Sequence, residues 1–133
     1  MLHKILLPID PATAEFWQPA IDAAVDIARK YRATLLVVWV APPVEVDPAD
    51  FTSIHMPALE ATVAERLPHD VAAELHLRAD WGDPDREICN AAEELGADLI
   101  VMGTHRPQDG ESLGDSNAAA VVLNAKCSVY VVR

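Results

Sequence analysis

The feature that most constrains the fold is an alternation of short, continuously apolar runs with segments of helical periodicity. Four runs are apolar without alternation: residues 4–9, 34–41, 98–103 and 128–132. Strands with this pattern must be covered on both faces, as they are in the parallel sheets of α/β proteins. A fifth segment, residues 71–79, instead alternates Leu75 and Leu77 with Glu74 and His76. Its wet face predicts a strand at the edge of the sheet.

The segments between these runs predict four helices: residues 18–31, 57–67, 84–95 and 116–125. Pro19 and Pro84 suit a first helical turn, where a missing N–H costs nothing, whereas the proline-rich region 42–70 predicts only a short helix. This alternation of strands and helices predicts an open parallel sheet with helices on both faces. The length of 133 residues fits a single domain, residues 1–133, with a self-sufficient core.

Composition argues against several kinds of partner. The net charge is −11, with only three lysines, so the chain repels nucleic acid and anionic membranes. No apolar stretch is long enough to span a membrane, and residues 1–10 are typical of a strand rather than of a signal peptide. Cys89 and Cys127 lack metal-ligand spacing, and we expect them to be small buried residues of a cytoplasmic protein.

A ligand site is expected beyond the carboxyl ends of the strands, where the strand order of an open α/β sheet reverses. If the first and fourth strands are central neighbours, Asp10 and Gly103 face one crevice there. Asp10 suits a ribose hydroxyl or a metal ion, but it suits equally the capping of local N–H groups. Gly103 allows either the close approach of a ligand or a tight turn.

The last predicted helix begins at Ser116 and Asn117, which could present a hydroxyl and amide groups to a phosphate. The same residue types are also the favoured helix N-caps, so both interpretations stay open. The chain has no nucleophile elbow, no Cys–His nucleophile pair and no Gly-Lys-Ser sequence. We therefore expect no catalytic residues, and the five histidines have no spacing that predicts a metal site.

Three blocks of sequence carry a resemblance to a known family: "KILLPID", "WGDPDREICNAAEELGADLIVMGTH" and "DSNAAAVVLNAKCSVYVVR". With them the chain resembles the universal stress protein family along almost its whole length. "THRP" is most similar to a short bacterial subgroup that has His-Arg-Pro after the fourth strand. The resemblance implies the strand order 3-2-1-4-5 and a homodimer joined through the fifth strand, at Val129, Tyr130, Val131 and Val132. A second copy would cover an apolar edge that otherwise invites strand pairing.

Many members of this family bind ATP, which implies a nucleotide site in this chain. The positions that match the adenosine end of that site are Pro8, Ile9, Asp10 and Val40, the last by its backbone. Met102 and Gly103 match the residues that enter the phosphate loop. The resemblance thus implies ATP or AMP as a ligand, with Mg²⁺ bound through the nucleotide and reached by Asp10.

The phosphate loop departs from the family pattern G-x2-G-x9-G-[ST]. Its second glycine is replaced by Arg106, next to His105. When the pattern is aligned on the hydroxyl residue Ser116, its third glycine is replaced by Asp115, after eight residues instead of nine. Ser116 keeps the hydroxyl position, and Gly114 stands one residue early. A carboxylate about 4 Å from a phosphate charge costs roughly 4 kcal/mol at an effective dielectric constant near 20. Asp115 therefore disfavours ATP, although a bridging Mg²⁺ would reverse the sign.

Three functions follow as expectations. The first is a cytoplasmic dimeric stress-response protein that senses an adenine nucleotide and signals to an unidentified regulatory protein. The second is an interaction dimer that binds no nucleotide because Asp115 closes the loop. The third, for which the residues offer least support, is a slow nucleotide hydrolase.

Overall fold

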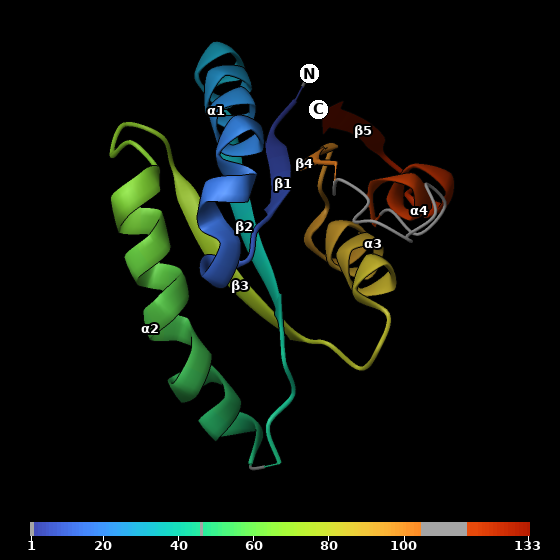
Figure 1. Cartoon of the computed structure of the whole chain (residues 1–133). Coiled ribbons are helices and arrows are strands. Elements are labelled where there is room, and N and C mark those ends of the chain that lie inside the picture. Colours follow the sequence, from blue (N-terminus) through green and yellow to red (C-terminus); the bar gives the residue numbers. More distant parts are fainter. Residues whose placement is uncertain (1, 46, 105–116) are drawn as a thin grey trace.

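Five parallel strands form one sheet in the order β3-β2-β1-β4-β5 (Figure 1). The computed structural model describes residues 2–45, 47–104 and 117–133. The strands are β1 (Lys4–Pro8), β2 (Thr34–Ala41), β3 (Ala73–Ala79), β4 (Leu99–Gly103) and β5 (Ser128–Val132). The helices are η1 (Pro11–Thr13), α1 (Ala14–Tyr31), α2 (Pro48–Arg66), α3 (Pro84–Leu95) and α4 (Asn117–Asn124). The predicted fold class and strand order are confirmed, and β3 lies at an edge as its wet face predicted.

The central strands are buried on both faces because helices cover each side. Ile5 and Leu7 point into a core that they share with α1 and α2, whereas Leu6 points into a second core with α3 and α4. All three side chains are fully buried. Figure 1 shows α1 and α2 on one side of the sheet and α3 and α4 on the other. Two covered faces explain why these strands are continuously apolar.

Helix α1 begins earlier than its periodicity predicted. The Asp10 carboxylate caps the short helix η1, and α1 follows directly from Ala14. Pro19 therefore lies inside the helix, so its placement in a first turn was wrong. The prediction for Pro84 is confirmed, since it occupies the first turn of α3 behind the N-cap Asp83.

Helix α2 is longer than the predicted segment 57–67, and the expectation of a short helix in this region was wrong. It begins at Pro48, where the Asp47 side chain accepts a hydrogen bond from the Ala49 amide at 3.0 Å. Pro57 lies in its interior. Tertiary contacts hold the helix together across this proline, because the His55 ring meets Trp39 of β2 at 4.9 Å between centroids.

The two cysteines are half-buried rather than buried. Burial raises the pKa of both thiols, and the charge of Asp85 adds to this effect at Cys89. Both thiols are therefore protonated at neutral pH and poor nucleophiles. No helix in the described part of the chain combines the length and apolarity needed to cross a bilayer.

Candidate functional site

The strands separate at the carboxyl end of β1, and the cause is a proline. β1 pairs with β4 at only two positions, Ile5 and Leu6, but with β2 along its whole length. The Lys4 carbonyl accepts a hydrogen bond from the Asp98 amide at 2.8 Å, so even-numbered residues of β1 direct their backbone groups toward β4. Pro8 is such a residue and has no N–H to donate, which ends the ladder. A crevice opens beyond it.

The backbone of Val40 faces this opening. The Ile9 amide donates to the Val38 carbonyl at 2.9 Å, so even-numbered residues of β2 direct their backbone groups toward β1. Val40 is the next even-numbered residue of β2. The last residue of β1, Pro8, pairs with Val38, so no residue of β1 pairs with Val40. The residue that would donate to its carbonyl is Pro11, which has no N–H. Within the described residues the Val40 amide and carbonyl have no backbone partner on this side.

A pocket of about 230 Å³ lies at this point. Four of its lining residues are those predicted for the adenosine end of a nucleotide site: Pro8, Ile9, Asp10 and Val40. The structure therefore brings together residues from the ends of two neighbouring strands.

Asp10 has the capping role, which is one of the two interpretations that its sequence position left open. Its Oδ1 atom accepts a hydrogen bond from the Ala12 amide at 2.9 Å, which is the local capping arrangement. Its Oδ2 atom has no hydrogen-bond partner among the described residues, and the side chain lines the pocket. A carboxylate has two oxygens, each able to accept, so capping leaves one oxygen for a ligand.

Met102 and Gly103 take different places at the end of β4. The Met102 side chain is fully buried in the core on the α3 side, so only its backbone could meet a ligand. A Cβ atom at Gly103 would lie 3.8 Å from the Trp17 indole, which occupies the space in front of it. The other predicted phosphate-loop residues lie outside the described part of the chain: His105, Arg106, Gly114, Asp115 and Ser116. Asn117 is the first residue of α4, and its side chain is not described.

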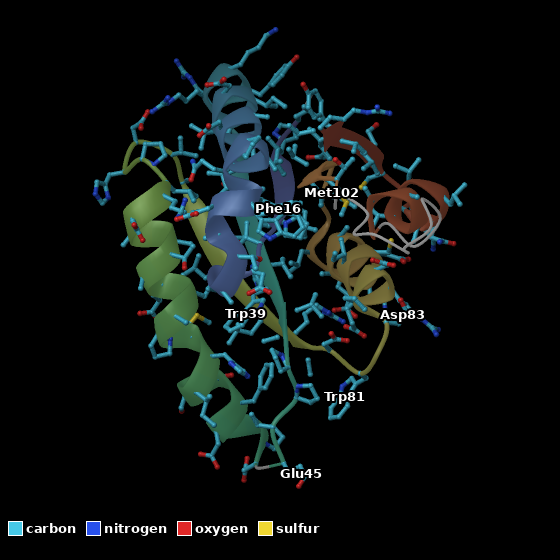
Figure 2. The ribbon with its side chains drawn as sticks, in the orientation of Figure 1. Phe16, Trp39, Glu45, Trp81, Asp83 and Met102 are labelled. Carbon is cyan, nitrogen blue, oxygen red and sulfur yellow. The ribbon has the colours of Figure 1, made fainter. Side chains whose placement is uncertain are left out.

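Several lining residues were not predicted as site residues. Trp17 of α1, Trp39 of β2 and Asp80 after β3 also line the pocket, as do Val38, Pro84 and Ile88. Figure 2 shows Trp39 near the carboxyl end of β2, with Trp81 and Asp83 on the loop that leads from β3 to α3. Asp80 could have been found from the sequence by the rule for strand ends that led to Asp10. It directly follows the segment predicted as a strand, residues 71–79. Trp17 gave no such signal, because it lies before the helix predicted from residue 18 and does not directly follow a predicted strand.

Negative charge gathers along the side of the pocket near α3. The Asp80 Oδ1 atom accepts a hydrogen bond from the Gly82 amide at 2.8 Å, which fixes its carboxylate in this loop. Burial raises the pKa of the Asp85 carboxyl, and the charges of Asp83 and Asp80 raise it further. In the part of the chain that the structure describes, no group of three or more potential ligand side chains could hold a metal ion.

The sequence profile of the universal stress protein family matches residues 1–133. This chain belongs to that family. Universal stress protein G of Shigella flexneri is 41% identical over 58 residues, a match that covers 44% of this chain and 39% of the relative. The matched part is thus less than two thirds of that relative's length. A universal stress protein of Methanocaldococcus jannaschii is 28% identical over 148 residues, which covers all of this chain and 83% of the relative.

Solved structures of the same family share the fold. A universal stress protein from Archaeoglobus fulgidus superposes with a TM-score of 0.75 at 23% identity, over the full length of both chains. A structure of the Archaeoglobus fulgidus protein in complex with dAMP gives a TM-score of 0.69 at 22% identity, again over both full chains. A family member from Arabidopsis thaliana with AMP bound gives 0.66 at 21% identity, over 98% of this chain and 90% of the other.

Proposed function

We propose that this universal stress protein is a regulatory protein that binds an adenine nucleotide in the pocket at the ends of β1 and β2. The observation that carries this proposal is the pair of open backbone groups at Val40. Adenine presents an amino donor beside ring-nitrogen acceptors. The carbonyl and amide of one residue can accept from and donate to such an edge, so Val40 offers a complementary pair.

The rest of the pocket fits a nucleoside. Ile9, Val38 and Ile88 supply apolar surface for a planar base, while Asp10 supplies a carboxylate oxygen. Small-molecule sites combine apolar walls with a few polar groups in this way. The Asp10 Oδ2 atom could accept a hydrogen bond from a ribose hydroxyl. The relatives solved with AMP and with dAMP support this class of ligand.

Mg²⁺ would enter this site with the nucleotide phosphates rather than through a protein cage. The described residues gather no metal-binding group, and Asp10 alone supplies too few oxygen ligands for a Mg²⁺ ion. ATP or AMP, with Mg²⁺ held by the phosphates, remains the cofactor proposal. We propose no hydrolysis, because the described pocket contains carboxylates but no arrangement of nucleophile and base.

The proposal includes a homodimer through β5. In the described chain β5 pairs with β4 on one side only. Tyr130 is 49% exposed, and Leu123 of the adjacent α4 is 83% exposed. Val129, Val131 and Val132 are half-buried in the single chain. A second copy that paired along this edge would cover these side chains, and the nucleotide state could then reach a partner protein through the dimer.

The test is calorimetric titration of AMP, ATP and adenosine into the purified protein and into Asp10→Asn. Asparagine keeps an acceptor for the Ala12 amide but offers an amide in place of the second oxygen. We expect the variant to bind each ligand about tenfold more weakly. Glu60→Gln, on the exposed face of α2, is the control and should bind as the wild type does.

Absence of heat and of any melting shift with all three ligands would contradict nucleotide binding. It would favour the alternative of an interaction dimer without nucleotide. Asp115→Gly then separates the two ideas, because a protein whose loop is closed by Asp115 should gain ATP binding on this change.

A further inference from the structure

We propose that the free edge of β3 is a second self-association surface, on which β3 pairs antiparallel with β3 of another copy of this chain. This pairing is separate from the proposed dimer through β5, because the two strands lie at opposite edges of the sheet (Figure 1). The inference follows from the open backbone groups of β3, from the symmetry of its sequence and from the side chain of His76.

The hydrogen bonds between β3 and β2 identify which backbone groups of β3 are open. The Leu35 amide donates to the Ala72 carbonyl at 2.9 Å, so even-numbered residues of β3 direct their backbone groups toward β2. The Asp80 amide, which donates to the Ala41 carbonyl at 2.8 Å, continues this series. The odd-numbered residues direct their backbone groups toward the free edge: Ala73, Leu75, Leu77 and Ala79. Within the described chain these outward groups have no hydrogen-bond partner.

β3 lacks the features that usually protect the edge of a sheet. Natural edge strands are often very short, or carry a lysine, a proline or a bulge that prevents pairing with another strand. β3 has seven residues, pairs with β2 along its whole length without a bulge, and contains neither lysine nor proline. Its edge is therefore open to a further strand.

The sequence of β3, AELHLRA, reads the same from both ends except that a glutamate stands opposite an arginine. In a symmetric antiparallel pair, each residue faces the one at equal distance from the centre in the other copy. Leu75 then faces Leu77, and Ala73 faces Ala79. These are the outward-facing residues, so they become hydrogen-bonded pairs that exchange both backbone bonds. Every open backbone group of the edge gains a partner in this register.

The charged side chains of β3 agree with the same register. Glu74 faces Arg78 of the other copy, and residues directly opposite on one face of an antiparallel pair interact. Glu74 is exposed, whereas Arg78 already donates to Glu87 and Glu94 of α3, at 2.7 Å each, through its Nε and Nη1 atoms. The Arg78 Nη2 group has no partner among the described residues. It keeps N–H donors for Glu74 of the other copy.

His76 is the central residue of β3 and faces itself across the two-fold axis of such a pair. Its Nε2 atom has no hydrogen-bond partner in the described chain, since the Glu74 Oε2 atom lies 3.9 Å away. The side chain is 31% exposed, so a group from another molecule can reach the ring. A neutral imidazole carries one donor and one acceptor. Two facing rings can therefore form a hydrogen bond with each other.

The pairing is weaker than a permanent interface. Its contacts form at the surface, where backbone groups exchange water for a protein partner and exposed ion pairs contribute little. We expect a dissociation constant on the order of 1 mM. Dilute protein then shows only the association through β5, and pairing through β3 adds to it in concentrated protein.

Cross-linking by oxidised glutathione tests the register of the pair. His76→Cys brings two new thiols face to face, because Cα atoms of a non-hydrogen-bonded pair are about 4.5 Å apart, a distance that suits a disulfide. Glu74→Cys is the matched control, since its two copies lie four residues apart along the paired strands, about 13 Å. Non-reducing electrophoresis should show at least about fivefold more covalent dimer for His76→Cys than for Glu74→Cys. The wild type controls for Cys89 and Cys127.

Sedimentation tests the pairing without a cross-link. We expect the average mass of the wild-type protein to rise about 1.5-fold as its concentration increases from about 20 μM to about 1 mM. His76→Glu places like charges directly opposite each other, beside Glu74 of both copies, and should abolish this rise. His69→Glu makes the same change at an exposed residue outside β3 and should preserve it.

A wild-type mass that stays constant over this range overturns the inference, and this outcome includes an edge that accepts only strands of other proteins. An equal rise in His76→Glu also overturns it, as does stronger cross-linking of Glu74→Cys, since the strands would then pair elsewhere or in another register. The mass of dilute protein reports on β5 alone, so none of these results bears on the proposed dimer. The concentration series needs only the wild-type protein, so the test stands even if a variant does not fold.

Discussion

At the scale of the residue, Asp98 shows how one side chain fixes the position of a strand. Its Oδ2 atom accepts hydrogen bonds from the His3 amide at 2.8 Å and from the Lys4 amide at 2.9 Å. These bonds join the amino ends of β1 and β4, the same two strands that separate at Pro8. The site therefore depends on two strands, β1 and β4, that are hydrogen-bonded at their amino ends and separate at their carboxyl ends.

We predict that Asp98→Ala lowers the free energy of unfolding by about 1 kcal/mol at pH 7, since two charge-assisted hydrogen bonds are lost at a position that water can reach. The hydrogen bonds from the His3 and Lys4 amides hold the pKa of the Asp98 carboxyl below its usual value. The stabilisation is therefore complete above the unfolded-state pKa of about 3.9 and disappears as the pH falls through the lower folded-state value. Urea unfolding of both proteins at pH 7 and near pH 3 measures this, and an equal difference at both pH values would contradict it.

At the scale of the element, α2 carries a proline in its interior and still forms a helix of 19 residues. Pro57 deprives the Ser53 carbonyl of its usual helical partner. Contacts to the sheet compensate: Leu59 is fully buried, and the His55 Nε2 atom hydrogen-bonds the Pro42 carbonyl at 2.9 Å. Packing rather than local propensity decides the length of this helix.

We predict that Pro57→Ala stabilises the protein by about 1 kcal/mol or more. The change restores a backbone hydrogen bond and introduces a strong helix former. This gain is larger than the roughly 0.4–1 kcal/mol of stability that is lost because alanine makes the unfolded chain more flexible than proline does. Pro84→Ala is the matched control, because Pro84 sits in a first turn where no hydrogen bond is missing. Thermal unfolding followed by circular dichroism should show a higher Tm for the first variant only. A lower Tm for Pro57→Ala would contradict the explanation.

At the scale of the whole molecule, the proposed dimer depends on the edge of β5, which pairs with β4 on one side only within the described chain. Lysine at a strand edge blocks pairing with another strand. If two copies pair through β5, Tyr130→Lys should convert the dimer to a monomer of about half the mass. Tyr31→Lys places the same change at an exposed position on α1 and should leave the mass unchanged. Sedimentation equilibrium measures both, and a wild-type protein that is already monomeric would rule out the proposed dimer.

The sequence alone determined the five strands, the order of the elements and several residues of the candidate site. Continuous apolar runs predicted strands covered on both faces, because a strand exposed to water on one face would alternate. The rule for strand ends led to Asp10, and the resemblance to the family added Pro8, Ile9 and Val40. The prediction of the strands is confirmed because it depends on residues that are neighbours in the chain, whereas the binding role of these four residues stays a prediction.

Tertiary structure decided what the sequence could not. The backbone groups of Val40 are open because β1 ends beside them, which depends on the register between strands far apart in the chain. Trp17 and Asp80 reach the pocket from a helix and from the far strand β3. The length of α2 likewise depends on its contacts with β2. Periodicity reports on local structure, whereas a pocket forms from side chains that only folding brings together.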